Sequence, residues 1–76
     1  MNVVLYSRTN CHLCEAFEQE LNDFSQTTEL VCEKIDIDSQ PQLQSLYGSD
    51  VPVLMLNDKM ICQHFFDKDK MIKVLF

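Results

Sequence analysis

Two cysteines, Cys11 and Cys14, are the residues of this sequence best suited to chemistry. They stand three positions apart in the segment "CHLC", a few residues after an apolar run. Helical neighbours at this spacing lie about 5 to 6 Å apart, so a small adjustment at a helix start brings the two sulfurs within disulfide distance. The spacing therefore favours a dithiol that opens and closes without large backbone movement.

The start of a helix favours a thiolate, because unpaired amides and the positive end of the helix dipole lie there. Cys11 is nearer that end, so we predict that Cys11 is the nucleophile and Cys14 the resolving thiol. Arg8, and His12 if protonated, would lower the thiol pKa further. The alternatives are a solvated loop charge for Arg8 and an exposed, uninvolved side chain for His12.

Zinc is the main competing use of the cysteine pair, because a structural zinc site needs four ligands. Four further side chains could complete such a site: His12, Cys32, Cys62 and His64. Cys32 and Cys62 fall in different predicted strands, however, and form no second closely spaced pair. We therefore interpret both as small core residues and expect no metal.

The composition limits the partners. The chain has 76 residues, enough for one domain over residues 1–76, and carries twelve acidic against six basic residues, for a formal charge of -6. Such a charge repels a phosphate backbone, so we expect no nucleic-acid partner. We expect a monomer whose partner is a protein or small-molecule disulfide.

The cellular location is predicted from the apolar runs and the cysteines. The longest apolar runs are far shorter than the roughly 20 residues that span a bilayer, and the N-terminus lacks a signal-peptide pattern. We therefore predict a cytoplasmic protein with no membrane contact. Thiols are normally kept reduced there, which favours a catalytic or metal-binding pair over a structural disulfide.

The elements that position the pair follow from hydrophobic periodicity. Residues 3–6 are continuously apolar, which is typical of a central strand. An amphipathic helix then begins at or just before the cysteines, and its predicted apolar face consists of Leu13, Ala16, Phe17, Leu21 and Phe24. Residues 30–37 alternate as an edge strand with a polar face and with an apolar face of Val31, Ile35 and Ile37.

A second helix is predicted after residue 39. Ser39 and Gln42 form a capping-box pattern, and Pro41 suits the first turn, where no amide donor is needed. Gly48 falls where a left-handed residue would end the helix. The predicted apolar face consists of Leu43, Leu46 and Tyr47.

The last part of the chain predicts a hairpin and a helix. Residues 51–56 and 59–63 read as strands joined by a two-residue turn at Asn57 and Asp58. Asp67 can cap a final helix. Its predicted inward side chains are Met71, Ile72, Val74 and Leu75, and Asp69 and Lys73 lie one turn apart on its surface.

The predicted order is therefore β-α-β-α-β-β-α, an α/β fold. A strand-helix-strand crossover makes the first two strands parallel, whereas the hairpin strands are antiparallel. The result is a four-stranded mixed sheet with helices on both faces. A Cys-x-x-Cys motif that joins the first strand to the first helix is the arrangement expected of a thioredoxin-like redox protein.

The sequence also resembles the glutaredoxins, and in particular a small glutaredoxin-like family with a Cys-x-Leu-Cys motif. The segments that carry the resemblance are "RTNCHLCEAF", "EKIDIDSQPQLQSLYG" and "VPVLMLND". The resemblance implies a thioredoxin-like fold and thiol-disulfide exchange in cell redox homeostasis, with Cys11 attacking and Cys14 resolving. It also implies that Pro52 follows a cis peptide bond facing the cysteines, with the Val51 backbone free to pair with an extended substrate.

Three departures from the dithiol glutaredoxins bear on glutathione. Those enzymes usually carry Pro-Tyr between the cysteines, Thr before Val-Pro, and a Gly-Gly pair that helps hold glutathione. The positions here read His12-Leu13, Asp50 and Phe65-Phe66. Bulky side chains obstruct close backbone approach, and Asp50 repels an anionic ligand.

We therefore expect no bound cofactor and only weak binding of glutathione, which remains a possible reductant. Phe65 and Phe66 are interpreted as core or rim residues. The alternative to an oxidoreductase is a thioredoxin-fold protein-binding module without redox turnover, because fold alone does not determine function.

Overall fold

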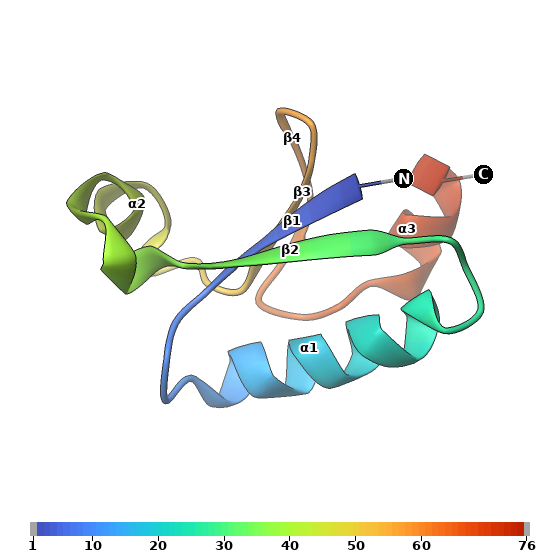
Figure 1. The fold of residues 1–76 in the computed structure, drawn as a ribbon, viewed down its shortest axis with the longest axis horizontal. Coiled ribbons are helices and arrows are strands. Elements are labelled where there is room, and N and C mark those ends of the chain that lie inside the picture. The colour runs from blue at the N-terminus through green and yellow to red at the C-terminus, as the bar shows by residue number, and fades with distance from the viewer. Residues whose placement is uncertain (1, 76) are drawn as a thin grey trace.

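The computed structural model describes residues 2–75 and has the element order predicted from the sequence (Figure 1). A short 3-10 helix between the second strand and the second helix is the one addition. The elements are β1 (Asn2–Ser7), α1 (His12–Ser25), β2 (Val31–Asp36), the 3-10 helix η1 (Ile37–Ser39), α2 (Pro41–Tyr47), β3 (Val53–Leu56), β4 (Lys59–Gln63) and α3 (Lys68–Leu75).

The four strands form one mixed sheet in the order β2-β1-β3-β4. β1 and β2 are parallel, with Asn2 opposite Val31 and Ser7 opposite Asp36. β3 is antiparallel to both β1 and β4. The predicted parallel first pair, the antiparallel hairpin and the edge position of β2 are all confirmed. The central position of β1 places the residues that follow it, including the cysteines, at the middle of one end of the sheet.

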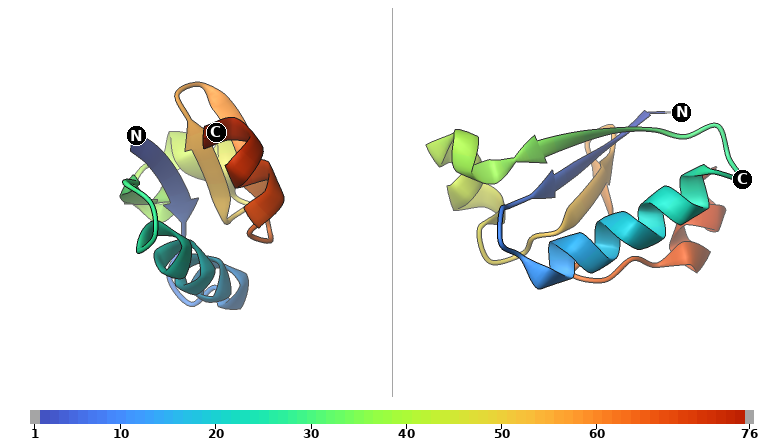
Figure 2. Two further views of the ribbon diagram at one scale, coloured as in Figure 1. Left: turned by 90° about the vertical axis from the view of Figure 1, so that its right-hand side faces the viewer. Right: turned by 60° about the horizontal axis from the view of Figure 1, so that its bottom comes forward.

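The helices divide between the two faces of the sheet. α1 and α3 lie on the same side (Figure 2), and their buried side chains meet Val3 and Leu5 of β1 in the main core. Because side chains alternate along a strand, Tyr6 points to the opposite face. There its ring stacks on Tyr47 of α2, with ring centroids 4.4 Å apart. The predicted arrangement with helices on both faces is confirmed.

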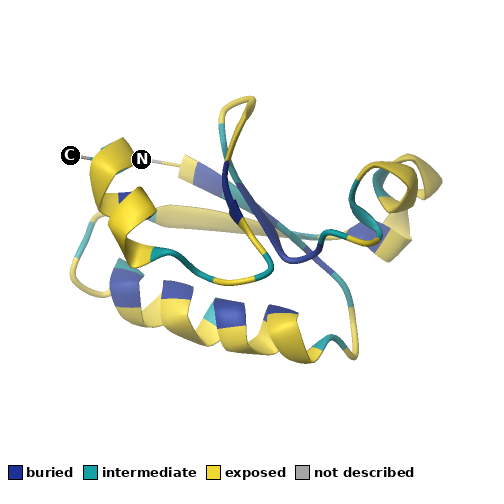
Figure 3. Ribbon diagram, turned by 180° about the vertical axis from the view of Figure 1, so that it is seen from behind, coloured by how far each residue is buried: buried dark blue, intermediate teal, exposed yellow. Residues whose placement is uncertain are grey.

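The buried faces of α1 and α3 are narrower than predicted. In α1 the buried residues are Cys14, Phe17, Leu21 and Phe24, whereas Leu13 and Ala16 are exposed. The buried stripe of this helix faces the sheet (Figure 3). In α3, Met71 is buried and Leu75 is half-buried, but Ile72 and Val74 are exposed. A helix that packs on a sheet buries one stripe, so apolar residues one position beside the stripe remain in solvent.

The predicted apolar face of β2 is only partly buried. Ile37, just past the strand, is fully buried and Ile35 is half-buried, but Val31 is 63% exposed. α2 lies at the opposite end of this face, by the C-terminal ends of β1 and β2 (Figure 1), and therefore does not reach Val31.

Three predictions for α2 are wrong. Ser39 does not cap the helix: its hydroxyl donates to the Asp36 carbonyl, and Gln40 is the N-cap without a side-chain cap bond. Gly48 has a right-handed backbone conformation, with φ -52°. Glycine fits there because a Cβ would lie only 2.5 Å from the Gln44 carbonyl oxygen. Leu46 is exposed, since the short helix buries no residue completely. The first-turn position of Pro41 is confirmed.

The cap of α3 is confirmed, because the Lys70 amide donates to Asp67 Oδ1 at 3.1 Å. The hairpin turn is also confirmed, with Asn57 in the left-handed conformation that asparagine tolerates. Within residues 2–75, none of the helices is long and apolar enough to cross a membrane.

Candidate active site

Cys11 and Cys14 lie at the junction of β1 and α1, where the sequence places them. Asn10 has a positive φ of 59°, which turns the chain from the strand into the helix. Cys11 is then the extended N-cap residue of α1, with φ -112° and ψ 109°. The two cysteines are joined by a disulfide and their Cα atoms are 5.1 Å apart.

The sulfur of Cys11 occupies the place of a capping group. Cys11 Sγ accepts a hydrogen bond from the backbone N–H of Cys14 at 3.1 Å, which satisfies one of the amides left unpaired at a helix start. A negative charge on this sulfur would be stabilised by that amide and by the helix dipole. The local geometry thus supplies the two effects that favour a thiolate at a helix N-terminus.

The two cysteines differ in exposure. Cys11 is half-buried, whereas Cys14 is 2% exposed. Cys14 belongs to a small buried cluster with Ile37 and Val51, separate from the main core. A reactant from solvent can therefore reach Cys11 but not Cys14.

The segment before β3 forms the other side of this cluster. The Val51–Pro52 peptide bond is cis, as the resemblance implied. The expectation that the Val51 backbone is free is wrong for its amide, which donates to the Tyr47 carbonyl at 3.1 Å and closes the last turn of α2. Pro52 is engaged too, because its carbonyl accepts from the His64 amide at 2.8 Å. Within residues 2–75 no backbone N–H donates to the Val51 carbonyl, which is therefore left for the predicted pairing with substrate.

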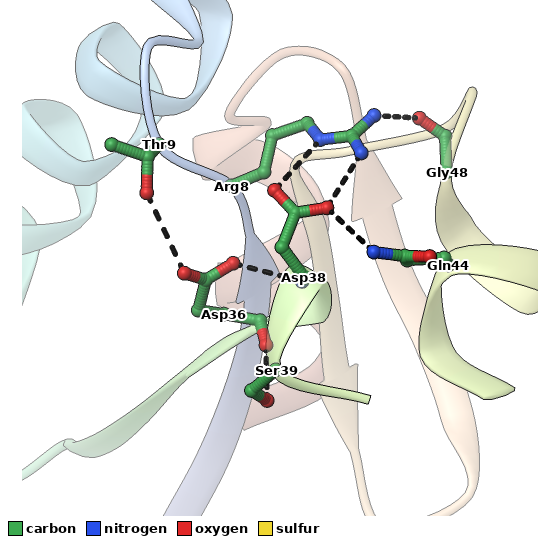
Figure 4. A network of polar contacts seen from close by, with 7 residues as sticks. All are labelled: Arg8, Thr9, Asp36, Asp38, Ser39, Gln44 and Gly48. Carbon is green, nitrogen blue, oxygen red and sulfur yellow. Dashed lines mark hydrogen bonds and ion pairs between the residues drawn. The ribbon is translucent and has the colours of Figure 1, made fainter. Parts of the chain in front are cut away.

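Arg8 pairs with a carboxylate of η1 (Figure 4). Its Nη2 and Nε atoms donate to the two carboxylate oxygens of Asp38 at 2.7 and 3.4 Å, and Nη1 donates to the Gly48 carbonyl at 3.2 Å. Gln44 donates to the same carboxylate at 3.1 Å. These contacts hold the loop after β1 against α2. Because Asp38 offsets the positive charge of Arg8, the effect of Arg8 on the cysteines is weaker than its position in sequence suggested, and a tuning role stays a prediction.

The Arg8–Asp38 pair predicts a dependence of stability on pH. The hydrogen bond from Arg8 holds the pKa of Asp38 below its ordinary value. A depressed carboxyl pKa stabilises the fold above the unfolded pKa of about 3.9, and this stabilisation is lost as pH falls through the lower folded value. The effect is small because the pair is exposed. We expect Asp38→Asn to lower the melting temperature slightly at pH 7, with a difference from wild type that shrinks below about pH 4.

Thermal unfolding followed by circular dichroism across this pH range measures the difference. Asp23→Asn is the matched control, since Asp23 accepts a hydrogen bond from the neutral amide of Gln19. A difference between wild type and Asp38→Asn that is unchanged from pH 7 to pH 3 would contradict the assignment.

Three further residues considered in the sequence, His12, Cys32 and Cys62, differ in exposure. His12 is exposed, and its tuning role stays a prediction. Cys62 is buried, as predicted, and burial raises its thiol pKa. Cys32 is exposed, so its assignment to the core is wrong: the edge strand β2 leaves it in solvent. Among residues 2–75, no three His, Cys, Asp or Glu side chains gather closely enough to hold a metal ion.

The two aromatic residues before α3 have different environments. Phe66 packs edge-on against Phe17, with centroids 5.5 Å apart, and lies 5.8 Å from the ring of Phe24. Phe65 is 70% exposed. The interpretation as core or rim packing is thus confirmed for Phe66 but not for Phe65.

Sequence reasoning missed two residues beside the site. Asp38 is 30 positions from Arg8, and no local pattern reports a pair so far apart. Ser7 is buried at the end of β1, four positions before Cys11. The signal for Ser7 was present, because it continues the alternation of the buried Val3 and Leu5.

Three comparisons agree with this arrangement. The family model of the glutaredoxin-like domain (DUF836) matches residues 2–76. The glutaredoxin-like protein YDR286C homolog of Dictyostelium discoideum is 32% identical over 78 residues, which cover 93% of this chain and 71% of that protein. The solution structure of Ne2328 from Nitrosomonas europaea matches with a TM-score of 0.86 and 36% identity, over 99% of this chain and 91% of that one.

A more distant structural match concerns the fold alone. Thioredoxin 1 of Thermosipho africanus superimposes with a TM-score of 0.68 at 19% identity, over 99% of this chain and 90% of that one. The mixed sheet with helices on both faces is therefore a thioredoxin-like fold.

Proposed function

Because the chain belongs to the glutaredoxin-like (DUF836) family, we propose that it is a thiol-disulfide oxidoreductase that acts through Cys11 and Cys14. The observation that carries this proposal is the hydrogen bond from the Cys14 amide to Cys11 Sγ at the start of α1. It supports the proposal because the more accessible sulfur lies where a thiolate would be stabilised, and the sulfur of Cys14 is close enough to resolve a mixed disulfide.

The proposed reaction has two steps. In the first, the Cys11 thiolate attacks one sulfur of a substrate disulfide, forming a mixed disulfide and releasing the other substrate sulfur as a thiolate. In the second, Cys14 loses its proton and attacks Cys11 Sγ, so that the bond to the substrate breaks and the second substrate thiolate leaves. The substrate gains two electrons, and the protein is left with the Cys11–Cys14 disulfide.

An external thiol reductant then restores the dithiol, and no bound cofactor takes part in the proposed reaction. Glutathione can act as this reductant but is proposed to bind weakly, because two bulky residues, Phe65 and Phe66, replace the open Gly-Gly backbone of the dithiol glutaredoxins. The only glycine of the chain, Gly48, lies in another loop. The proposed substrate is a protein or small-molecule disulfide, held in part by the Val51 carbonyl. We propose a monomer that works in the reducing cytoplasm.

The redox equilibrium of the pair tests the proposal. The protein is equilibrated in glutathione buffers of graded potential, alkylated, and analysed by intact mass. We expect a reversible Cys11–Cys14 disulfide with a midpoint between roughly -180 and -270 mV. Cys32→Ser protein serves as the control, because the exposed Cys32 could otherwise form a separate glutathione adduct.

Dithiothreitol buffers extend the titration to more reducing potentials. A pair that never exchanges with a disulfide in either buffer series would contradict the oxidoreductase. It would favour the binding module, in which the cysteines take no part.

A further inference from the structure

Ser7 is a buried hydroxyl without a partner. The residue is 1% exposed, and within residues 2–75 its Oγ atom makes no hydrogen bond. A buried hydroxyl that is left unpaired costs free energy, and native proteins usually satisfy such groups with protein atoms or with ordered water. The position of Ser7 therefore indicates a place for water inside the fold.

A pocket of about 380 Å³ lies beside Ser7, between the end of β1 and the first turns of α1. Its lining includes Ser7 and the buried Cys14, and charged side chains lie around it: Arg8, Glu15, Glu18, Lys34 and Asp36. Each water molecule in the liquid occupies about 30 Å³, so the pocket has room for several. It joins the buried cysteine to a polar surface.

Glu18 offers a second water-binding group in the same pocket. Its Oε1 atom is buried and forms an ion pair with Lys34 Nζ at 2.6 Å, so this oxygen already has a partner. Glu18 therefore brings a charged pair to the pocket that Ser7 also lines. Water between this pair and Ser7 Oγ would satisfy the unpaired hydroxyl.

The buried position of Cys14 creates a need for such water. In the proposed reaction Cys14 must lose a proton each time it attacks the mixed disulfide, and must regain one when the pair is reduced. A thiol that is 2% exposed cannot exchange this proton directly with bulk water. Proton transfer requires a hydrogen-bonded acceptor within reach, either directly or through one water.

We propose that the pocket holds a chain of water that carries the Cys14 proton, with Ser7 as its positioning residue and Glu18 toward its outer end. This inference rests on the proposed oxidoreductase function. In the resolving step the Cys14 S–H bond breaks and its proton passes to the pocket water. The sulfur electron pair forms the bond to Cys11 Sγ, and the substrate sulfur leaves with the electrons of the broken bond. Reduction of the pair returns the proton along the same route.

The test separates the two steps with 5,5′-dithiobis(2-nitrobenzoate), whose released thiolate absorbs visible light. Attack by Cys11 releases the first thiolate in a concentration-dependent phase, and attack by Cys14 releases the second in a phase independent of concentration. All proteins carry Cys32→Ser, so that the exposed thiol does not contribute. We expect Ser7→Ala to leave the rate of the first phase unchanged and to slow the second phase by about tenfold or more. The slowing should be smaller than the 10²- to 10⁴-fold loss typical when a general base is removed, because some water remains in the pocket.

A pair of isosteric variants guards against a purely structural effect. Ser7→Thr and Ser7→Val place the same bulk in the buried strand, but only threonine keeps the hydroxyl. We expect Ser7→Thr to retain a fast second phase and Ser7→Val to lose it. Because both variants change the packing in the same way, the difference between them reports the hydroxyl alone. Glu18→Gln should also slow the second phase, whereas Glu20→Gln on the exposed side of α1 should not.

The outcomes distinguish this inference from the proposed function. A second phase that is equally fast in wild type, Ser7→Ala and Ser7→Val would overturn the water route while leaving the oxidoreductase intact. A wild-type protein with no second phase would overturn the dithiol reaction itself.

Discussion

Replacing Cys11 by serine is expected to reduce disulfide reduction to the rate of the buffer alone. The reason is chemical, because a serine hydroxyl is not ionised near neutral pH and forms no mixed disulfide, whereas a helix-capping thiol is activated as a thiolate. The fold should be preserved, since serine is a preferred N-cap residue and its hydroxyl can accept the Cys14 amide that Cys11 Sγ now accepts. Reduction of a model disulfide coupled to an external thiol measures the rate, and circular dichroism confirms that α1 is intact.

Cys14→Ser is the matched variant for this experiment. It keeps the nucleophile but removes the resolving thiol, so we expect a mixed disulfide at Cys11 to accumulate and to be visible by intact mass. Cys62→Ser changes a buried cysteine outside the pair and should react as wild type does. Full activity in Cys11→Ser would show that another group carries the reaction and that the assigned roles are wrong.

The largest expected effect on stability is that of Phe66→Ala, which should cost about 2 to 4 kcal/mol of the free energy of unfolding. Phe66 is the ring that contacts both Phe17 and Phe24, and its removal leaves a cavity between α1 and the segment before α3. A domain of 76 residues has a total stability of only roughly 5 to 10 kcal/mol, so the loss is a large share of the whole. Urea unfolding followed by circular dichroism measures it.

The adjacent Phe65 provides the control, because it has the same side chain but is 70% exposed. We expect Phe65→Ala to change the free energy of unfolding by less than about 0.5 kcal/mol. Equal costs for the two variants would show that contact with the rings of α1 does not explain the role of Phe66.

The fold was predictable because its signals are local. Hydrophobic periodicity placed β1, α1 and the hairpin, and the position of the cysteines after a strand placed them at a helix start. The errors concern properties set by tertiary neighbours. The edge position of residues 30–37 was predicted, but no sequence pattern shows how far the helices cover each face of that strand, and both Val31 and Cys32 are left exposed.

The site was predictable in its cysteines but not in its surroundings. The dithiol is encoded by two residues three positions apart, whereas the partner of Arg8 is 30 positions away and became evident only in the folded chain. The Val51 amide was expected to be free because the path of α2 was unknown, and the end of that helix uses it. Gly48 was predicted to adopt a left-handed conformation, but the structure needs glycine there because a side chain would collide with the Gln44 carbonyl oxygen.

The unequal exposure of the two sulfurs has a kinetic consequence for the proposed enzyme. Because Cys14 is only 2% exposed and cannot contact a reacting disulfide or thiol, the oxidised substrate and the external reductant must both react at Cys11 Sγ. The two cannot react with Cys11 Sγ at the same time, so turnover follows a ping-pong scheme. The substrate disulfide reacts with the reduced protein, and the external reductant reacts with the oxidised protein. An excess of either partner can then inhibit turnover by binding the wrong form, and the balance of the two concentrations sets the rate.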